Sequence, residues 1–477
     1  MRDRSGSDDL PRSFQTSPPT AAGWETGPAM DDARPCPVPP APQPGEPLEG
    51  AALLRSVAPG HDAVLDAALA ELETSGRATD PLAAGAALRA AGIAPERAAA
   101  ALSQAELRER ARIKLGDRVD AMLLTRAGVE QATRWQVAAL HAAVLRAAGV
   151  EQVTDVGCGL GADTHALAAA GLNVTGIEAD EQTAAAAAHN LAGLGRVVHD
   201  EADATLARPE GVDPARWGLW FDPARRTGVA DATGRARRVS SPQDLRPSLD
   251  LVTTLAQRAA LTGCKVGPGW RHADIPPGAH AQWVSHAGDL VEAVLWMGPA
   301  LRPQDDPAPV SPTVPRAGTR SATRLGTDGS VLAHADSSQL PAEGHRVLGS
   351  QDEPGTFLVE PDPALSQAGL LGVALGPGDA ELGPGVGWGT SDSPAGSAWT
   401  RTHRIVELLA PRPKAIRQWA RRTEVGDLVV RKHGSTVDPA TVRKGVRTTG
   451  TRRAILLLTR VGDRQLALEI APPILSA

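Results

Sequence analysis

The chain has 477 residues and a formal net charge of −6 at pH 7, with three cysteines and no tyrosine. That length suits two or three domains, and the scattered cysteines, Cys36, Cys158 and Cys264, indicate neither a disulfide framework nor a zinc site. No apolar run reaches the length of a transmembrane helix, and the N-terminus is polar and acidic, unlike a signal peptide. We therefore expect a cytoplasmic protein with neither a membrane nor a metal as a partner.

Two segments precede the first expected strand. Residues 1–50 are rich in Pro, Ser, Gly and Asp and have no apolar period, which predicts a disordered tail. Residues 51–150 carry Ala, Leu and Val at spacings of three to four, a pattern typical of helices, and Pro81 and Pro95 mark helix starts. This helical N-terminal region offers few chemical groups, so we expect it to pack against the domain that follows.

Residues 151–298 alternate between strand patterns and helical patterns. The expected strands are Val153–Val156, Asn173–Glu178, Arg196–His199, Trp217–Phe221, Cys264–Val266, Gln282–Ser285 and Val291–Trp296. The expected helices are Asp163–Ala170, Glu181–Leu194 and Pro242–Leu261. Strands that alternate with helices, followed by two closely joined strands, predict an α/β fold: a Rossmann-like, mostly parallel seven-stranded sheet with an antiparallel edge.

The remaining chain divides into a linker and a small α/β module. Residues 299–354 are rich in Pro, Gly, Asp and Ser with little periodicity, which predicts a flexible linker or insertion. Order is expected to return over residues 355–477, where strand and helix patterns resume. The expected elements there are strands at Thr356–Val359, Leu428–Arg431, Ala454–Leu458 and Leu466–Ile470, and helices at Pro363–Ala374 and Arg412–Arg422.

Charge is unevenly spread along the chain. From Arg401 to the end there are 16 Lys and Arg against 6 Asp and Glu, a local charge of +10, which leaves −16 for the rest. Such asymmetry indicates that the basic part meets an anion, most often a nucleic acid, so RNA or DNA is an expected partner. The alternative is a solvated basic surface with no partner.

A strand that runs into a glycine turn is the most informative motif. The stretch from Val153 to Gly161 is a short apolar strand followed by glycines at 157, 159 and 161, and a second strand ends on Glu178. Strand, glycine turn, helix, strand and acid is the order that holds a nucleotide-like cofactor at the carboxyl edge of a parallel sheet. The alternative is a glycine loop that merely turns a strand into a helix.

The residues after the glycines indicate which cofactor this turn would hold. A dinucleotide fingerprint has its third glycine one position later and presents the helix N-terminus to a pyrophosphate. Here an acid, Asp163, stands at the mouth of the helix, where it suits an ammonium or a sulfonium better than a pyrophosphate. The segment resembles motif I of the class I S-adenosylmethionine-dependent methyltransferases.

That resemblance implies S-adenosylmethionine as the cofactor and assigns contacts to it. Gly157, Gly159 and Gly161 would wrap the methionine and ribose part, and Glu178 would accept the ribose hydroxyls. The ammonium would go to Asp155 or Asp163, and Asp203 would accept the adenine amino group. An ordinary helix cap is an equally open interpretation of Asp203.

The expected catalytic residues follow the fourth strand. Asp222-Pro223 stands where methyltransferases that modify amino groups of bases carry an Asp/Asn/Ser-Pro-Pro-aromatic motif. An acid that accepts the hydrogens of a ring amine localises its lone pair for attack on a methyl group. Ala224 and Arg225 depart from the second proline and the aromatic residue. The alternative is a strand-ending Asp-Pro turn followed by two solvated arginines.

Further residues are expected around the acceptor. Arg225 and Arg226 could bind substrate phosphates or, in the case of Arg225, stack on a base. Thr133 and Arg134 precede the helix that leads into the first strand, although Thr133 could simply cap that helix. Trp270 follows the fifth strand, where substrate loops usually lie, and could stack on a base.

Several short motifs together extend the resemblance beyond the glycine turn. They resemble the class I methyltransferases of actinobacteria and related bacteria that carry a C-terminal THUMP-like domain, and the sheet domain is distantly similar to RNA methyltransferases of the trimethylguanosine-synthase type. The quoted pieces are Leu124-Thr125-Arg126, Glu130 to Arg134, Asp222-Pro223-Ala224-Arg225, Glu360 to Ala364, Ala368-Gly369-Leu370, Lys432-His433-Gly434, Val437-Asp438-Pro439 and Leu458-Thr459-Arg460.

The resemblance implies methylation of RNA, with residues 355–477 as a THUMP-like module that delivers it. The most plausible acceptor is an amino group of a purine. Two alternatives stay open at this point: a protein or small-molecule methyltransferase of the same fold, and an RNA-binding protein that holds S-adenosylmethionine without turning it over.

Overall fold

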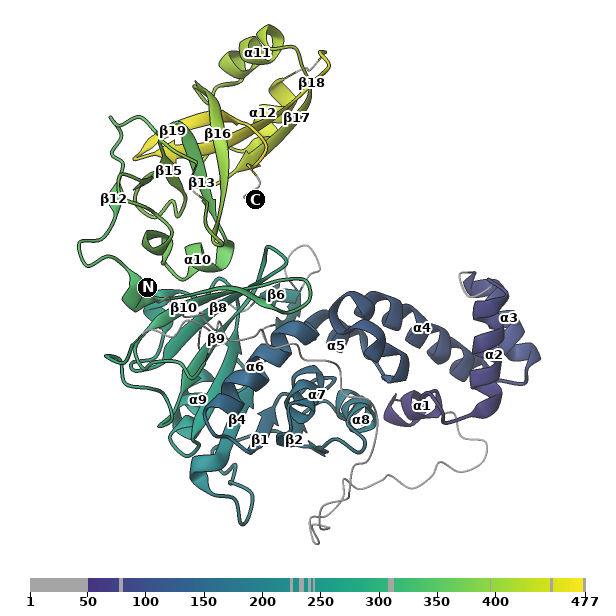
Figure 1. The fold of residues 1–477 in the computed structure, drawn as a ribbon. Helices are drawn as coiled ribbons and strands as arrows, with labels where there is room; N and C mark the ends of the chain where they lie inside the picture. The colour runs from purple at the N-terminus through teal and green to yellow at the C-terminus, as the bar shows by residue number, and fades with distance from the viewer. Residues whose placement is uncertain are drawn as a thin grey trace, which may run out of the picture. The chain divides into compact units, whose positions relative to one another are not determined.

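A computed structural model describes residues 50–474 apart from 77–79, 224–225, 231–235, 239–241, 243–244, 308–312, 395 and 447–448. The tail predicted over residues 1–50 lies outside the described residues except for its last position, and so does Arg225. The chain from Pro42 to Ala477 forms one compact unit. Within it, helices come first, an α/β part follows, and a second, smaller sheet ends the chain (Figure 1).

The N-terminal part is helical, as its apolar period indicates. It comprises α1 (Gly50–Ser56), α2 (Ala63–Thr74), α3 (Pro81–Ala90), α4 (Pro95–Leu115), a 3-10 helix (Gly116–Ala121), α5 (Arg126–Gln131) and α6 (Trp135–Ala147). Asp80 caps α3 by accepting the N–H groups of Leu82 and Ala83, and proline occupies the first position of both α3 and α4. The α4 residues Leu107, Ala111 and Leu115 share a core cluster with Leu160 and Ala186 of the sheet domain, so these helices pack on that domain.

A nine-stranded mixed sheet forms the centre of the α/β part. Its order is β11-β10-β8-β9-β7-β4-β1-β2-β3. The strands β3, β2, β1, β4 and β7 are parallel, β9 is antiparallel to both β7 and β8, and β10 is parallel to β8. Their bounds are β1 (Gln152–Val156), β2 (Asn173–Glu178), β3 (Arg196–His199), β4 (Trp217–Phe221), β7 (Leu261–Val266), β8 (His280–His286), β9 (Asp289–Met297), β10 (Arg320–Leu325) and β11 (Val331–Asp336).

The helices of this part are α7 (Ala162–Ala169), α8 (Glu181–Asn190) and α9 (Leu249–Ala256). Two short strands after β4, β5 (Arg226–Ala230) and β6 (Ala236–Arg238), form a separate antiparallel pair. The predicted α/β class with a mostly parallel Rossmann-like arrangement is confirmed, and all seven expected strands are present. The expected number of strands was too low by two, and the last expected helix, Pro242–Leu261, is shorter than predicted.

The flexible linker predicted over residues 299–354 was wrong for part of its length. Residues 320–336 form β10 and β11, which extend the central sheet. The sequence hides β10 in part because two of its buried side chains, Ser321 and Thr323, are polar and bond to β8. His280 Nε2 lies 2.8 Å from Ser321 Oγ, and Gln282 Nε2 donates to Thr323 Oγ1 at 2.9 Å. Polar groups that satisfy each other can fill a sheet face without any apolar alternation.

The C-terminal part is built on an eight-stranded sheet of order β12-β14-β15-β13-β16-β19-β18-β17. The strands are β12 (Arg346–Val347), β13 (Phe357–Pro361), β14 (Ala380–Glu381), β15 (Gly389–Ser391), β16 (Thr400–Leu409), β17 (Val425–Lys432), β18 (Arg452–Val461) and β19 (Arg464–Ile470). Three helices accompany them: α10 (Pro363–Gln367), α11 (Pro413–Arg422) and α12 (Pro439–Gly445). Ile416 and Trp419 of α11 are buried against β17 and β18, in a core with Val430, Ala454 and Leu456.

The topology brings the predicted motifs to one edge of the central sheet. In this parallel set, β1 lies between β2 and β4, and β7 lies beyond β4 (Figure 1). The carboxyl ends of β1, β2, β4 and β7 therefore lie close together. Each of these strands is followed by a residue of a predicted motif or by a loop beside such a motif. Open α/β sheets bind ligands in the crevice at this edge, beside the strand where the order reverses.

Candidate functional site

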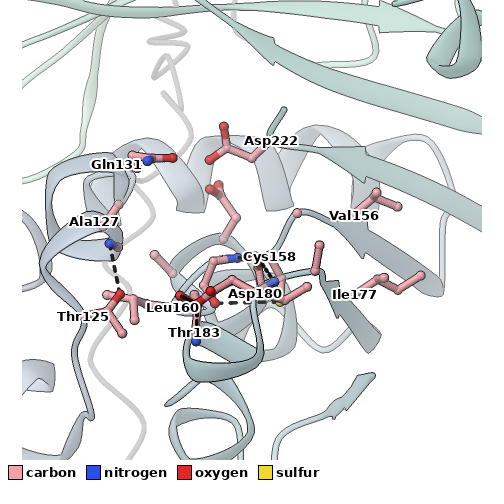
Figure 2. Close-up of a pocket in the computed structure, with 18 of the residues that line it drawn as sticks. Thr125, Ala127, Gln131, Val156, Cys158, Leu160, Ile177, Asp180, Thr183 and Asp222 are labelled. Atoms are coloured by element: carbon pink, nitrogen blue, oxygen red, sulfur yellow. Dashed lines mark hydrogen bonds between the residues drawn. The ribbon is translucent and has the colours of Figure 1, made fainter. Parts of the chain in front are cut away.

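A cavity of about 560 Å³ lies at the carboxyl ends of β1, β2 and β4. Figure 2 shows Asp222 and Gln131 at one end of it and Asp180 and Thr183 at the other. Segments from the loop before α5 to the end of β4 contribute to its wall. The lining includes Thr125, Arg126, Gly128, Gln131, Thr133, Gly157, Cys158, Gly159, Asp163, Ile177, Glu178, Asp180, Thr183, Asp200, Glu201, Asp222, Arg246 and Pro247.

The three glycines of the turn do different things. A Cβ on Gly157, which has φ +76°, would lie 2.8 Å from the main-chain oxygen of Asp222, so Gly157 allows β1 and β4 to end close together. Gly159 (φ +55°) lines the cavity, and a Cβ there would meet no atom within 4 Å. It therefore leaves space where a ligand can approach the backbone. Gly161 precedes α7 and packs against Leu191, 3.0 Å from the position of a Cβ, away from the cavity.

Glu178 ends β2 with its half-buried carboxylate in the cavity wall. Its Oε2 accepts the N–H of Gly159 at 2.9 Å, and its Oε1 accepts the N–H of Asp180 at 3.0 Å. These two bonds orient the carboxylate and join the glycine turn to the loop after β2. Each oxygen keeps a further lone pair, so two hydroxyl donors can still bind.

Asp163 lies at the start of α7 and is held on both carboxylate oxygens. Thr133 Oγ1 donates to Oδ2 at 2.5 Å, and His141 Nδ1 lies 2.8 Å from Oδ1. On its other side, Nε2 of His141 lies 2.5 Å from Oε1 of Glu292. Burial alone would lower the pKa of His141, but the charges and hydrogen bonds of Glu292 and Asp163 outweigh it and raise that pKa to about 9. His141 is therefore an imidazolium between two carboxylates.

The pKa values separate Asp163 from Asp155. Burial would raise the pKa of Asp163, but the hydrogen bond from His141 and the charges of His141 and Lys265 lower it, so this carboxylate is charged. Burial, with the charge of Asp163, raises the pKa of Asp155 well above its usual range. Asp155 is fully buried, bonds to Thr164 Oγ1 and does not line the cavity. Of the two acids expected at the ammonium, Asp163 is the one that reaches the cavity.

Asp203 lies outside the cavity wall. It is exposed, and its Oδ1 accepts the main-chain N–H of Thr205 at 2.7 Å and its hydroxyl at 2.6 Å. These bonds lower the pKa of Asp203, the side-chain bond most. Asp203 thus stabilises a turn at Thr205, and because no helix begins there, the helix-cap interpretation was wrong. Its neighbours Asp200 and Glu201 line the cavity. The local motif could not tell which of these three acids would do so.

Asp222 follows β4 directly and projects into the cavity, with buried Pro223 next to it (Figure 2). Its side chain is 21% exposed, and its Oδ2 accepts a hydrogen bond from Lys265 Nζ at 2.7 Å. The described residues give Oδ1 no hydrogen bond. One oxygen of the carboxylate is thus fixed, and the other can accept a donor from the cavity.

A smaller cavity of about 130 Å³ adjoins the first, and Gln131, Ala132 and Thr133 line both. Arg134, Lys265 and Glu292 line only the smaller one. The structure thus places Thr133 in the wall of both cavities and Arg134 in the wall of the smaller one.

Another predicted residue, Trp270, lies apart from the cavities. Trp270 is buried in the main core, where its indole N–H donates to Asp274 O at 3.3 Å, and it lines neither cavity. Arg226 begins β5.

Sequence analysis missed Lys265, His141 and Glu292. They come from β7, α6 and β9, so only the fold brings them together. One local signal existed for Lys265, because it is a charged residue near the end of a strand whose six residues are all buried. Lysine is almost never fully buried unless it is paired.

The larger cavity fits a cationic ligand. Its walls carry the acids Asp163, Glu178, Asp180, Asp200, Glu201 and Asp222 against the bases Arg126 and Arg246. An excess of carboxylates disfavours a pyrophosphate and favours an ammonium and a sulfonium. Within the part of the chain that the structure describes, no group of three or more His, Cys, Asp or Glu could hold a metal ion. No described helix is long and apolar enough to cross a lipid bilayer.

Comparisons with known proteins agree with this geometry. A family model for the THUMP domain-like family matches residues 400–472, which run from β16 to the end of β19. The chain is 26% identical over 373 residues to an uncharacterized S-adenosylmethionine-dependent methyltransferase of Mycobacterium tuberculosis, in strains CDC 1551 and H37Rv. That similarity covers 76% of this chain and 92% of the relative.

A solved structure shares the fold. The crystal structure of a protein described as a methyltransferase, from Porphyromonas gingivalis W83, matches with a TM-score of 0.57 at 21% identity. The match covers 79% of this chain and 91% of the other. Together, these comparisons confirm the family resemblance that the sequence motifs indicated.

Proposed function

Because the chain is an S-adenosylmethionine-dependent methyltransferase with a C-terminal THUMP-like domain, we propose that it methylates an amino group of a base in RNA. The observation that carries this proposal is the position of Asp222. Its carboxylate follows β4, reaches into the cavity, and presents an oxygen that no described residue engages. Asp222 lies at one end of the cavity. Asp180 and Thr183, which follow β2 in the chain, lie at the other end (Figure 2).

The cofactor contacts follow from the same wall. We assign the ribose hydroxyls to Glu178, whose oxygens each keep a lone pair, and the ammonium to charged Asp163. Gly159 leaves the space that lets the ligand approach the backbone, while Gly157 and Gly161 shape the turn. When bound, S-adenosylmethionine supplies an electrophilic methyl group on a sulfonium.

Asp222 would act on the acceptor amine. A ring amine is a poor nucleophile because its lone pair is delocalised, and Oδ1 of Asp222 accepts one of its hydrogens and turns the lone pair toward the methyl group. The cofactor would supply the methyl group to this nitrogen, and the proton that the nitrogen then loses would pass to Asp222. Pro223 fixes the backbone after the carboxylate, and Thr133 and Arg134 border the adjoining cavity where the acceptor enters. Arg225 and Arg226 follow and would bind substrate phosphates.

The charge of the C-terminal part supports RNA as the substrate. Basic side chains on α11 and α12, among them Lys414, Arg417, Arg421 and Lys444, are exposed, while Ile416, Trp419 and Val442 of the same helices are buried. When the phosphates of an RNA bind such a basic face, counterions that were bound to the RNA are released, which favours binding. We propose the reducing cytoplasm as the compartment, since the three scattered cysteines of the sequence indicate no disulfide framework.

Transfer of labelled methyl from S-adenosylmethionine tests the proposal. The full chain is given RNA, protein and small molecules from cells that lack it, so that its site is unmodified. We expect label in an RNA fraction, and the Asp222→Ala variant should lose this label while it binds the cofactor with nearly unchanged affinity. Asp203→Ala, which lies outside the cavity, should behave like the parent chain.

The other outcomes are equally informative. Label only in protein or small molecules would overturn RNA as the substrate. No label anywhere, with cofactor binding intact, would favour a non-catalytic binder. Loss of cofactor binding together with transfer in Asp222→Ala would show that Asp222 supports the fold of the site and not the acceptor.

A further inference from the structure

The carboxylate of Asp222 is held by a lysine inside the sheet. Lys265 is the penultimate residue of β7, and its side chain is only 3% exposed. Its Nζ donates to Asp222 Oδ2 and to Thr133 Oγ1, each at 2.7 Å. An ammonium can be buried only where acceptors replace its water shell, so its neighbours must be arranged around it.

These bonds continue to the cofactor end of the site. Thr133 accepts from Lys265 and donates onward to Asp163 Oδ2 at 2.5 Å. Asp163 is fixed in turn by His141, whose ring stacks on Trp220 with centroids 4.2 Å apart. A continuous buried chain of hydrogen bonds therefore joins the carboxylate at the acceptor to the carboxylate at the cofactor.

The two carboxylates joined by these hydrogen bonds are stabilised by the positive charge of Lys265. Asp163 and Asp222 both act on Asp155, and each adds to burial in raising the pKa of that buried carboxyl, while Lys265 acts in the opposite direction. An ammonium placed between Asp163 and Asp222 offsets their mutual repulsion.

We propose that Lys265 is a positioning residue for methyl transfer, which fixes Asp222 so that Oδ1 faces the acceptor amine. The inference rests on the role proposed above for Asp222. Because Lys265 holds Oδ2, the plane of the carboxylate is set before the substrate arrives, and preorganised acceptors cost no rearrangement during reaction. Thr133 and Asp163 in turn fix Lys265. The cofactor site and the acceptor site are therefore held by the same series of hydrogen bonds.

The test is a double-mutant cycle on the full chain. Lys265→Met keeps an unbranched side chain, one atom shorter, and removes its charge, and we expect kcat to fall about 100-fold, as for a misplacement on the order of 1 Å. The Kd for S-adenosylmethionine should change by less than about threefold, because Lys265 does not line the larger cavity. In an Asp222→Asn background the same substitution should lower kcat by less than about threefold further, because residues that act as one unit are not additive.

Two further variants separate positioning from stability. Lys265→Arg keeps the positive charge and should retain more activity than Lys265→Met. Arg108→Met removes a half-buried cation of α4 that donates to Met122 O, away from both cavities, and should leave kcat unchanged.

Each contrary result has a distinct meaning. If Asp222→Asn lowers kcat but Lys265→Met does not, the positioning role alone is overturned. The same holds if the loss in the double variant equals the product of the losses in the two single variants. Full activity of Asp222→Asn would overturn the role of Asp222 and this inference with it.

Discussion

Gly157 and the main chain of Asp222 are in such close contact that a Cβ on Gly157 would lie 2.8 Å from the carbonyl oxygen of Asp222. The N–H of Asp222 also donates to Val156 O at 3.1 Å. In the proposed assignment, the glycine turn would face the cofactor and the Asp222 carboxylate the acceptor, so one backbone contact would join the two sites. The distance between the two functions is set where β1 and β4 end.

This contact predicts different results for two alanine substitutions in the turn. Both Gly157 and Gly159 have positive φ, so alanine at either costs about 1–2 kcal/mol of unfolding free energy through backbone strain. Gly157→Ala also drives a Cβ into the Asp222 carbonyl, so its loss of stability should be the larger and methyl transfer should fall. Gly159→Ala should mainly weaken cofactor binding, because its Cβ enters the cavity. Urea unfolding and calorimetric titration compare them, and equal losses in both assays would contradict the separate roles.

Glu178 should determine cofactor affinity. Glu178→Gln leaves one oxygen and no charge, and we expect binding of S-adenosylmethionine to weaken about 10- to 100-fold, the value of a hydrogen bond to a charged group. Asp203→Asn is the matched control, since it removes a charge from an acid outside the cavity wall, and its Kd should stay within about twofold. Isothermal titration of both variants checks this. Equal weakening would restore Asp203 to the cofactor site.

His141 predicts a loss of stability toward alkaline pH. Its pKa is about 9 in the folded chain and about 6.5 when unfolded, so the folded state holds the proton more tightly. This stabilisation is full below pH 6.5 and is lost as pH rises to 9, with an upper limit of about 3 kcal/mol. His280 and His334, whose pKa values burial lowers to about 3 and about 4, titrate below that window.

Unfolding by urea between pH 6.5 and 9 measures this effect. The free energy of unfolding should decline across the window in the parent chain and decline less in His141→Gln. The same slope in both proteins would show that the imidazolium between Asp163 and Glu292 does not carry the pH dependence.

The basic face of α11 should set the salt dependence of RNA binding. Lys414→Gln combined with Arg421→Gln removes two exposed charges, and the slope of log K against log salt should become shallower by about 1.5–2. Arg89→Gln combined with Arg110→Gln removes two exposed charges from α3 and α4 and should leave the slope unchanged. Filter binding at several salt concentrations gives both slopes. Equal slopes for the two double variants would exclude α11 from the RNA contact.

The sequence was most informative where local pattern and tertiary structure coincide. The bounds of β2, β3 and β4 agree with the predicted strands because an apolar run ends at a turn signal in each. It was least informative for β10 and for β16. In β10 the buried residues Ser321 and Thr323 are polar and satisfied by β8. In β16 exposed and buried side chains alternate only in part.

The candidate site shows the same limit. The glycine turn, Glu178 and Asp222 are adjacent to strand ends, so their placement at the sheet edge follows from the topology. Lys265, His141 and Glu292 reach the site from three further elements, and no spacing in the chain relates them. Asp203 and Trp270 fall in the right loops, yet the side chain of Asp203 bonds to Thr205 in a turn and that of Trp270 packs in the core, which depends on packing that a motif does not encode.

The strands β10 and β11 also determine where the protein can be cut into fragments. Ala322 of β10 and Ala335 of β11 share one core cluster with Trp283 of β8, and Leu365 of α10 completes that cluster. A fragment that stopped at Gly298 would strip β8 of its parallel neighbour and open this core to water. α10 belongs to this core, yet β13, which precedes α10, pairs with β15 and β16 of the second sheet. A single junction in the chain therefore cannot separate the two sheets and leave both intact.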